Sequence, residues 1–192
     1  NTKNSYKPLE GKLYETGIKY APSFLDGYIN LALFDLEQTN SLVSTGSGQQ
    51  TQAGEVTSQG IELEGSVQAT EALRLTAAYT YTDAKTNDTG NGDRQASLIP
   101  RHQASFWGNY KVQQGPVSGL EVGTGVRYIG SSVGIGAVNA DYTPIYGSAQ
   151  VPAQTVWDAM IGYDFAKNWR AQVNVNNLLN DTYVASCDYY CY

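Results

Sequence analysis

The chain has 192 residues, of which 41% are hydrophobic and only 16% are charged, with 20 glycines and 15 tyrosines. Its net charge of -6 and pI of about 4.7 exclude the clustered basic surface of a nucleic-acid-binding protein, so no nucleic-acid partner is expected. No apolar run approaches the roughly 20 residues of a membrane-spanning helix. The β-barrel is then the remaining way for this chain to cross a membrane.

The predicted elements are strands of roughly nine to fifteen residues in which apolar and polar side chains alternate, longer than the five or six of most soluble sheets. Their expected ranges, in chain order, are Lys12–Tyr20, Tyr28–Gln38, Gln59–Ala69, Leu73–Tyr81, Arg101–Val112, Leu120–Gly130, Val151–Phe165 and Trp169–Leu179. About eight strands of this length favour an antiparallel, membrane-spanning β-barrel.

The alternation predicts which side chains face lipid and which face the barrel interior. Expected on the lipid face are Tyr79, Tyr128 and Trp157; expected on the interior face are Glu62, Glu64, Glu121, Arg127 and Asp158. The Tyr28–Gln38 strand stays open, because two alternations compete. One contains Ile29, Leu31 and Leu33, and the other contains Ala32, Phe34 and Leu36.

The predicted connections alternate between short and long, as in outer-membrane barrels. Short links are expected at 21–27, 70–72, 113–119 and 166–168, and long polar loops at 39–57, 83–100 and 131–150, the loops facing the medium. Aromatic residues gather near the short links (Tyr20, Tyr28, Tyr110, Tyr163, Phe165, Trp169) and toward the long loops (Tyr14, Phe34, Tyr79, Tyr81, Tyr128). Two such bands suit membrane interfaces. A soluble sandwich has no reason to sort its aromatics this way.

Candidate chemical sites are few. His102 is the one histidine and lies within a strand, so neither a catalytic triad nor a histidine-rich metal site is expected, and the chain is not expected to be an enzyme. Glu62 and Glu64 are interpreted as lumen lining, not as acid-base catalysts. For Cys187 and Cys191, an oxidised pair closing a small outer loop is favoured over free thiols.

Three stretches together resemble the TonB-dependent ferric-siderophore receptors, and within them the ferrichrome and hydroxamate branch. They are Tyr-Glu-Thr-Gly-Ile-Lys-Tyr at 14–20, Gly-Ile-Glu-Leu-Glu-Gly at 60–65, and Asn-Val-Asn-Asn-Leu-Leu-Asn-Asp-Thr-Tyr at 174–183. The residues Ala185, Ser186 and Cys187, followed by Cys191 and Tyr192, resemble the disulfide-bearing last outer loop of that branch. The resemblance covers nearly the whole chain.

The resemblance implies that residues 1–192 are a C-terminal portion of a β-barrel of about 22 strands in the bacterial outer membrane. On this reading the chain is a fragment lacking the N-terminal plug and the final strand. The intact protein would import a ferric siderophore, with no covalently bound cofactor. Its partners would be the TonB complex, through the absent N-terminal region, outer-membrane lipid and lipopolysaccharide, and in some cases a phage or bacteriocin. The alternative is a passive porin or structural outer-membrane barrel.

The expected ligand contacts are four tyrosines in the last two outer loops: Tyr142, Tyr146, Tyr189 and Tyr190. A ferric hydroxamate is compact and largely uncharged, so a ring face and a hydroxyl donor suit it. An anionic catecholate complex would favour Arg and Lys, which these loops lack. The other interpretation, that these tyrosines only pack the loops, stays open.

Overall fold

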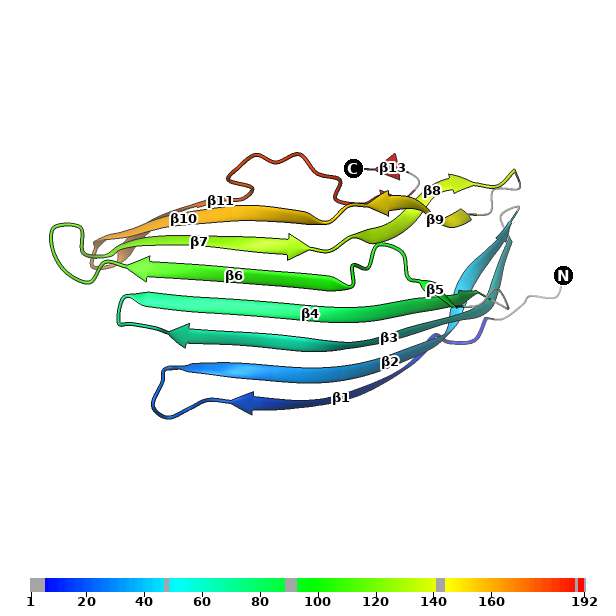
Figure 1. Cartoon of the computed structure of the whole chain (residues 1–192), viewed down its shortest axis with the longest axis horizontal. Helices are drawn as coiled ribbons and strands as arrows, with labels where there is room; N and C mark the ends of the chain where they lie inside the picture. Colours follow the sequence, from blue (N-terminus) through cyan, green and yellow to red (C-terminus); the bar gives the residue numbers. More distant parts are fainter. Residues whose placement is uncertain (1–5, 47–48, 89–92, 141–143, 189, 192) are drawn as a thin grey trace.

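The computed structural model describes residues 6–46, 49–88, 93–140, 144–188 and 190–191. It consists of one long, curved, single-layer sheet with a small second sheet beside one of its ends (Figure 1). Among the described residues, none forms a helix long and apolar enough to span a membrane.

The long sheet contains nine strands, of which eight follow the order β1-β2-β3-β4-β6-β7-β10-β11 and are here called the wall. Their bounds are β1 Glu10–Tyr20, β2 Gly27–Gly46, β3 Gln49–Gln68, β4 Leu73–Asp88, β6 His102–Lys111, β7 Leu120–Ile129, β10 Gln154–Ala166 and β11 Trp169–Val175; β5, Asp93–Gln95, pairs with β4 alone. Each wall strand is antiparallel to its neighbour. The wall therefore follows the eight predicted strands in number and order.

The second sheet, here called the outer sheet, has the order β13-β12-β8-β9. Its strands are β8 Ser132–Val138, β9 Pro144–Val151, β12 Cys187–Asp188 and β13 Tyr190–Cys191. The pair β12 and β8 is parallel and joins Asp188 to Ile135, whereas β8 and β9 form an antiparallel hairpin. This sheet lies at the end of the wall opposite the short turns, here called the hairpin end (Figure 1).

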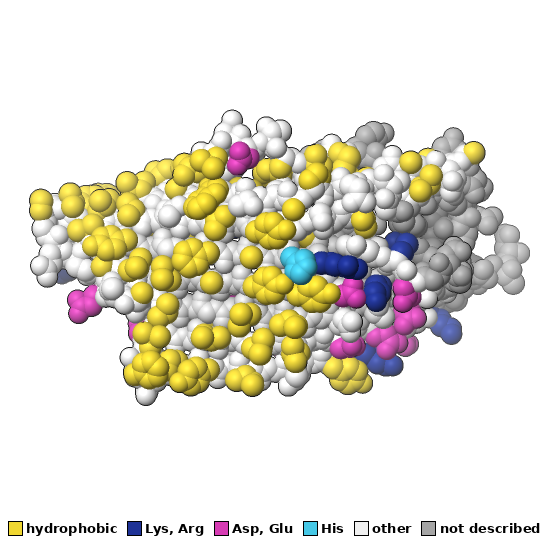
Figure 2. Space-filling model, viewed as in Figure 1, with side chains coloured by type: hydrophobic (Ala, Val, Ile, Leu, Met, Phe, Trp, Pro, Cys, Tyr) yellow, Lys and Arg dark blue, Asp and Glu magenta, His cyan; other side chains and the backbone are white. Residues whose placement is uncertain are grey.

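The register sorts side chains to two faces, because residues directly opposite each other in an antiparallel pair lie on the same side of a sheet. Tyr79 lies opposite Leu63 and Ala104, and Ala104 lies opposite Tyr128. Trp157 lies opposite Val126 on this same apolar face. Figure 2 shows hydrophobic side chains spread across it, with charged side chains gathered toward the hairpin end.

The other, polar face carries the charges that the alternation placed there. Arg127 lies opposite Ser105, Ser105 opposite Ala78, and Ala78 opposite Glu64. The same parity includes Glu62, Glu121 and Asp158. The predicted division of these residues between two faces is confirmed.

The pairing of β2 resolves the strand whose face the sequence left open. Leu31 lies opposite Leu63, so Ile29, Leu31 and Leu33 share the apolar face. Tyr28 and Phe34 consequently face the polar side, where the Lys19 ammonium lies 5.0 Å from the centroid of the Tyr28 ring. These two aromatics have the predicted positions along the strand but do not belong to a surface band on the apolar face.

The three long loops were wrongly predicted as irregular. β2 and β3 continue as a hairpin through most of 39–57, β4 extends to Asp88 and pairs with β5, and β8 and β9 occupy most of 131–150. These hairpins lie beyond the apolar face, so neither of their sides needs to be apolar and the period-two pattern is lost. The links at 21–26, 69–72, 112–119 and 167–168 are short, as predicted.

Burial is concentrated at the hairpin end, because a single curved layer has no second layer to cover it. The buried hydrophobic residues among those described are Ala84, Ala96, Ile135, Val151, Val156, Met160 and Cys187. Three of them, Ile135, Val151 and Cys187, belong to the outer sheet. Most large apolar side chains of the wall are instead exposed, including Phe106 at 47% and Ile161 at 51%.

Candidate functional site on the polar face and the outer sheet

At the short-turn end, the polar face carries an ion-pair network that joins four strands. Arg170 Nη2 lies 2.8 Å from Glu121 Oε2, and Arg170 Nη1 lies 3.0 Å from Asp164 Oδ1. Lys111 Nζ lies 2.8 Å from Asp164 Oδ2. Since these residues come from β11, β7, β10 and β6, the network ties neighbouring strands together on one face. The network contains two cations and two carboxylates, so it has no net charge. Its role is to stabilise the pairing of these strands.

A second ion pair lies nearer the hairpin end. Arg127 donates from Nε to Asp158 Oδ2 at 2.6 Å and from Nη2 to Asp158 Oδ1 at 3.1 Å, a bidentate pair. Asp158 is 7% exposed, and its carboxylate also accepts the backbone N–H of Asn177 at 2.9 Å. The carboxylate therefore has three donors, and the guanidinium is held in one orientation.

The same carboxylate marks where β11 ends. Asn177 has a φ of 55°, its side chain donates to the Asp181 carbonyl at 2.9 Å, and its Oδ1 accepts the Asp181 N–H at 2.9 Å. A left-handed Asn with such local bonds is typical of a turn. The strand predicted to reach Leu179 therefore ends at Val175, because the Asn-rich stretch that resembles the receptor family forms this turn.

His102 lies on the apolar face as an ordinary strand residue, as predicted. Its Nδ1 is 2.8 Å from the Tyr79 hydroxyl, and its ring centroid is 5.2 Å from that of Tyr81. In the part of the chain that the structure describes, no group of three or more His, Cys, Asp or Glu residues could hold a metal ion. These aromatic contacts place His102 in the ring-rich zone near the hairpin end of the apolar face.

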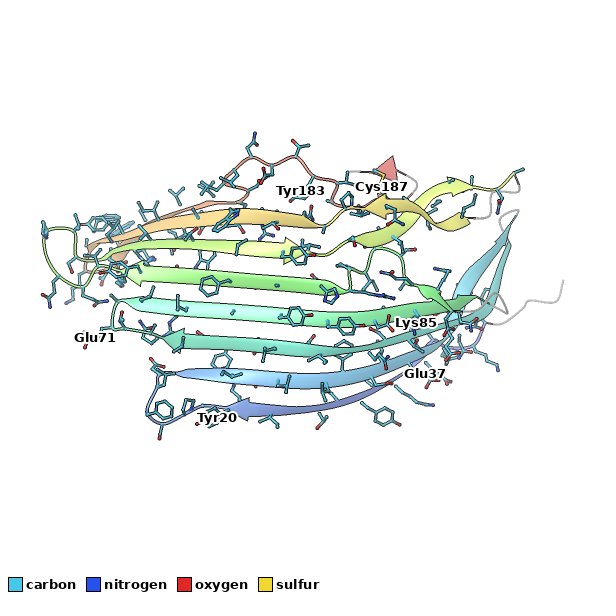
Figure 3. All side chains as sticks on the ribbon, viewed as in Figure 1. Tyr20, Glu37, Glu71, Lys85, Tyr183 and Cys187 are labelled. Atoms are coloured by element: carbon cyan, nitrogen blue, oxygen red, sulfur yellow. A yellow bond between two sulfur atoms is a disulfide. The ribbon has the colours of Figure 1, made fainter. Side chains whose placement is uncertain are left out.

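The outer sheet contains the predicted disulfide, between Cys187 and Cys191. Cys187 is 1% exposed and its backbone lies against Gly134 of β8 so closely that a Cβ there would collide with the Cys187 carbonyl oxygen. The Leu98 N–H donates to the Val133 carbonyl at 2.7 Å, which joins the 96–101 link to the same strand. Figure 3 shows Tyr183 and Cys187 on the C-terminal stretch that leads to this sheet.

The four predicted ligand tyrosines are only partly located. Tyr142 and Tyr189 lie outside the described residues. The backbone of Tyr146 lies in β9 opposite Ile135, and that of Tyr190 lies in β13 opposite Asp188. Both strands belong to the outer sheet, so the last two outer loops meet in one sheet. The ligand role of the four side chains stays a prediction.

Sequence reasoning placed Glu121, Arg127 and Asp158 on one face but missed their partners. The pairs depend on register: Arg127 and Asp158 come from adjacent strands that are offset, since Asp158 lies opposite Gly125 and not opposite Arg127. The sequence did offer one signal for such an ion pair, because Arg127 and Asp158 are opposite charges expected on the same face of the sheet. Nothing in the sequence indicated that Asn177 would donate to Asp158.

Comparisons with known proteins agree with this architecture. Residues 1–178 match the family described as TonB dependent receptor-like, beta-barrel. The chain is 37% identical over 191 residues to the ferrichrome outer membrane transporter/phage receptor of Escherichia coli (strain K12), covering 96% of this chain and 24% of that protein. It is 34% identical over 198 residues to the ferrioxamine B receptor of Salmonella typhimurium (strain SL1344), covering 98% of this chain and 27% of that protein.

Two solved structures show the same fold. The ferric-catecholate import receptor Fiu of Escherichia coli K12 superposes with a TM-score of 0.72 at 28% identity, covering 96% of this chain and 25% of that one. The ferripyoverdine receptor of Pseudomonas aeruginosa gives a TM-score of 0.75 at 24% identity, covering 94% and 25%.

The chain thus spans about a quarter of the length of the curated relatives it matches, 24% of the first and 27% of the second. The predicted barrel architecture and outer-membrane location are confirmed. In barrels of this kind the outward face is apolar and the interior is polar, so we assign the apolar face to lipid and the polar face to the lumen. Its relatives are receptors and transporters, not enzymes. The chain belongs to the TonB-dependent receptor β-barrel family and forms part of the wall of an outer-membrane barrel.

Proposed function

We propose that the protein containing this chain imports a ferric siderophore of the hydroxamate type across the outer membrane. The observation that carries the proposal is the match of nearly the whole chain to a ferrichrome transporter and a ferrioxamine B receptor, at 37% and 34% identity. The charged, hydrogen-bonding polar face is consistent with a lumen that a hydrophilic ligand passes. A passive porin is the less favoured alternative, because the matched relatives are receptors for particular ligands.

The four tyrosines supply the proposed chemistry of recognition. Tyr142, Tyr146, Tyr189 and Tyr190 would offer ring faces and hydroxyl donors to a compact, uncharged iron complex. The support from the structure is that the strands bearing Tyr146 and Tyr190 belong to the same outer sheet. The disulfide between Cys187 and Cys191 would keep the two tyrosines between them in a small ring.

The proposed partners follow from the family. Energy would come from the TonB complex, on which receptors of the matched family depend. Outer-membrane lipid and lipopolysaccharide would cover the apolar face and its aromatic ends. A phage or bacteriocin is a proposed adventitious partner, since one relative is named a phage receptor and a similar solved structure, the receptor FpvAI, is in complex with pyocin S2.

Uptake by the full-length receptor tests the proposal. In a bacterial strain deleted for its own hydroxamate receptors, the receptor should restore accumulation of iron-55 supplied as ferrichrome. Deleting TonB from that strain should abolish the accumulation, because transport against a gradient needs the energy that TonB delivers. Uptake that persists without TonB and rises linearly with ligand concentration would support the porin instead.

The tyrosines are tested by replacing Tyr189 and Tyr190 together by Ala in the full-length receptor. Ferrichrome affinity, measured by quenching of intrinsic fluorescence, should fall about tenfold or more, a change worth about 1.4 kcal/mol. Tyr110→Ala, on the apolar face of β6, is the control that removes one ring without approaching the outer sheet. Unchanged affinity in a folded double variant would assign these tyrosines to loop packing.

A further inference from the structure

The cations of the lumen face are unevenly distributed along the wall. Four of them, Lys19, Arg74, Lys111 and Arg170, lie within a few residues of the short turns. In the hairpin-end half of the wall strands that the structure describes, Arg127 is the remaining cation on this face. Farther toward the hairpin end, Arg94 of β5 lies opposite Thr86 and has the same parity, so Arg127 is the outermost cation on this face of the wall strands themselves.

The ion pair with Asp158 orients Arg127 but does not engage all of its N–H donors. Nε and Nη2 bind Asp158, while Nη1 donates to none of the residues that the structure describes. The described residues leave 46% of the Arg127 side chain exposed although Asp158 is almost fully covered, and the register puts Arg127 on the lumen face. A guanidinium fixed in this way loses little rotamer entropy on binding a further acceptor.

A depression of about 300 Å³ surrounds this guanidinium. Its polar lining on the lumen face comes from Thr80, Gln103, Ser105 and Arg127, which lie side by side on β4, β6 and β7. The side-chain hydroxyls of Thr80 and Ser105 and the side-chain amide of Gln103 form no hydrogen bond with another residue in the part of the chain that the structure describes. The volume suits one arm of a large chelate, not the whole molecule.

We infer that Arg127, Thr80, Gln103 and Ser105 form a donor subsite on the lumen wall, which hydrogen-bonds an oxygen-bearing arm of an uncharged iron chelate. This inference rests on the proposed function and adds the residues of a second contact, away from the outer-loop tyrosines. Asp158 neutralises Arg127, so the subsite offers directed N–H donors without a net positive charge. Carbonyl and hydroxamate oxygens gain from such donors, whereas a strongly anionic complex gains more from unpaired cations.

The test uses the full-length receptor in detergent and leaves the ion pair intact. The variant combines Gln103→Leu with Ser105→Ala, and the probe is a ferric trihydroxamate whose Kd is read from fluorescence quenching. Loss of two hydrogen bonds should raise Kd about tenfold or more. The matched control is Thr155→Val, at the same height on the apolar face opposite Tyr128, which should leave Kd within twofold.

A second variant, Arg127→Leu with Asp158→Leu, removes the guanidinium without leaving an unpaired buried carboxylate. It should raise Kd at least as much as the first variant. If the wild-type receptor itself does not bind the probe, the proposed function fails. If the wild type binds and both variants bind equally well, the subsite is wrong while the function stands. Variants that lower the melting temperature of the unliganded receptor but keep its affinity show that these residues contact another part of the protein, which also overturns the subsite.

Discussion

The wall and the outer sheet differ in whether their apolar side chains are covered by other parts of the chain. The wall is one layer whose strands pair along their whole length, and its large apolar side chains are exposed, such as Phe106 at 47% and Ile161 at 51%. The outer sheet has only short strands, yet Ile135, Val151 and Cys187 are buried in it. The wall depends on its surroundings, while the outer sheet has a small core of its own.

This difference follows from what each region contacts. In outer-membrane barrels the outward apolar residues meet lipid, so a wall of this kind needs no second layer to cover them. The outer sheet stands in water, where apolar groups must pack against each other and each buried methylene contributes about 0.8 kcal/mol. A substitution should therefore have opposite consequences in the two regions, and the following experiments use that contrast.

The largest effect is expected for Phe106→Arg, at the centre of the apolar face between Val126 and Ala77. A charge facing mid-bilayer should lower the free energy of unfolding by about 2–4 kcal/mol. Urea titration of the full-length receptor folded into lipid bilayers measures it. Thr76→Arg, on the lumen face of β4, is the control and should cost far less. Equal losses from both variants would contradict the assignment of the two faces.

Asp158→Ala should have the next largest effect, because it leaves Arg127 and the Asn177 N–H without their shared acceptor. We expect a loss of about 1–3 kcal/mol, moderated by the partial exposure of Arg127. Asp158→Asn keeps an acceptor oxygen and should lose less. Hydrogen exchange should show faster exchange at Asn177 and Leu178. Unchanged protection there would mean that this carboxylate does not hold the turn.

In the outer sheet, Gly134→Ala should separate β12 from β8, since the new Cβ would meet the Cys187 carbonyl oxygen. Overpacking of this kind costs about 1–3 kcal/mol, here confined to the outer sheet. Limited proteolysis should cut the C-terminal stretch faster while the wall stays protected. Gly11→Ala, whose added Cβ would have an ordinary contact at 3.8 Å, is the matched control and should change nothing.

The smallest effect is expected for Cys187→Ser combined with Cys191→Ser. The ring is short, so chain entropy stabilises it by no more than about 2 kcal/mol. Opening should be seen by hydrogen exchange within β12 and β13 alone, and the urea midpoint of the wall should not move. A shift of that midpoint would show that the outer sheet and the wall unfold as one unit.

The sequence predicted the wall well and the outer end poorly, for one physical reason. Where one face meets lipid, as with Ile61 and Leu63 against Glu62 and Glu64, alternation reports the face directly. Beyond the apolar face both sides meet water, so the pattern disappears and the hairpins were taken for loops. Phe34 shows the opposite failure. It is an aromatic residue on the lumen face, so the sequence pattern alone could not tell which face of its strand is apolar.

For the candidate site, the disulfide and the placement of charged residues on one face were predictable from the sequence. The bidentate bond of Arg127 to Asp158 was not, since it joins offset residues of two strands and depends on their register. The turn at Asn177 depends on the same carboxylate and was missed for the same reason. The roles of Tyr142, Tyr146, Tyr189 and Tyr190 stay predictions.

The parallel pairing of Asp188 with Ile135 has a consequence for the order of assembly. All of β9, β10 and β11 lie between these two residues in the chain, whereas paired wall strands follow each other directly or are separated only by β5, or by the β8–β9 hairpin. Closing the longer loop has a larger entropic cost and gains only a few hydrogen bonds, so it is favourable only after the intervening strands are in place. We therefore expect the wall strands to pair first, and the contact of β12 with β8 beside Cys187 to form last.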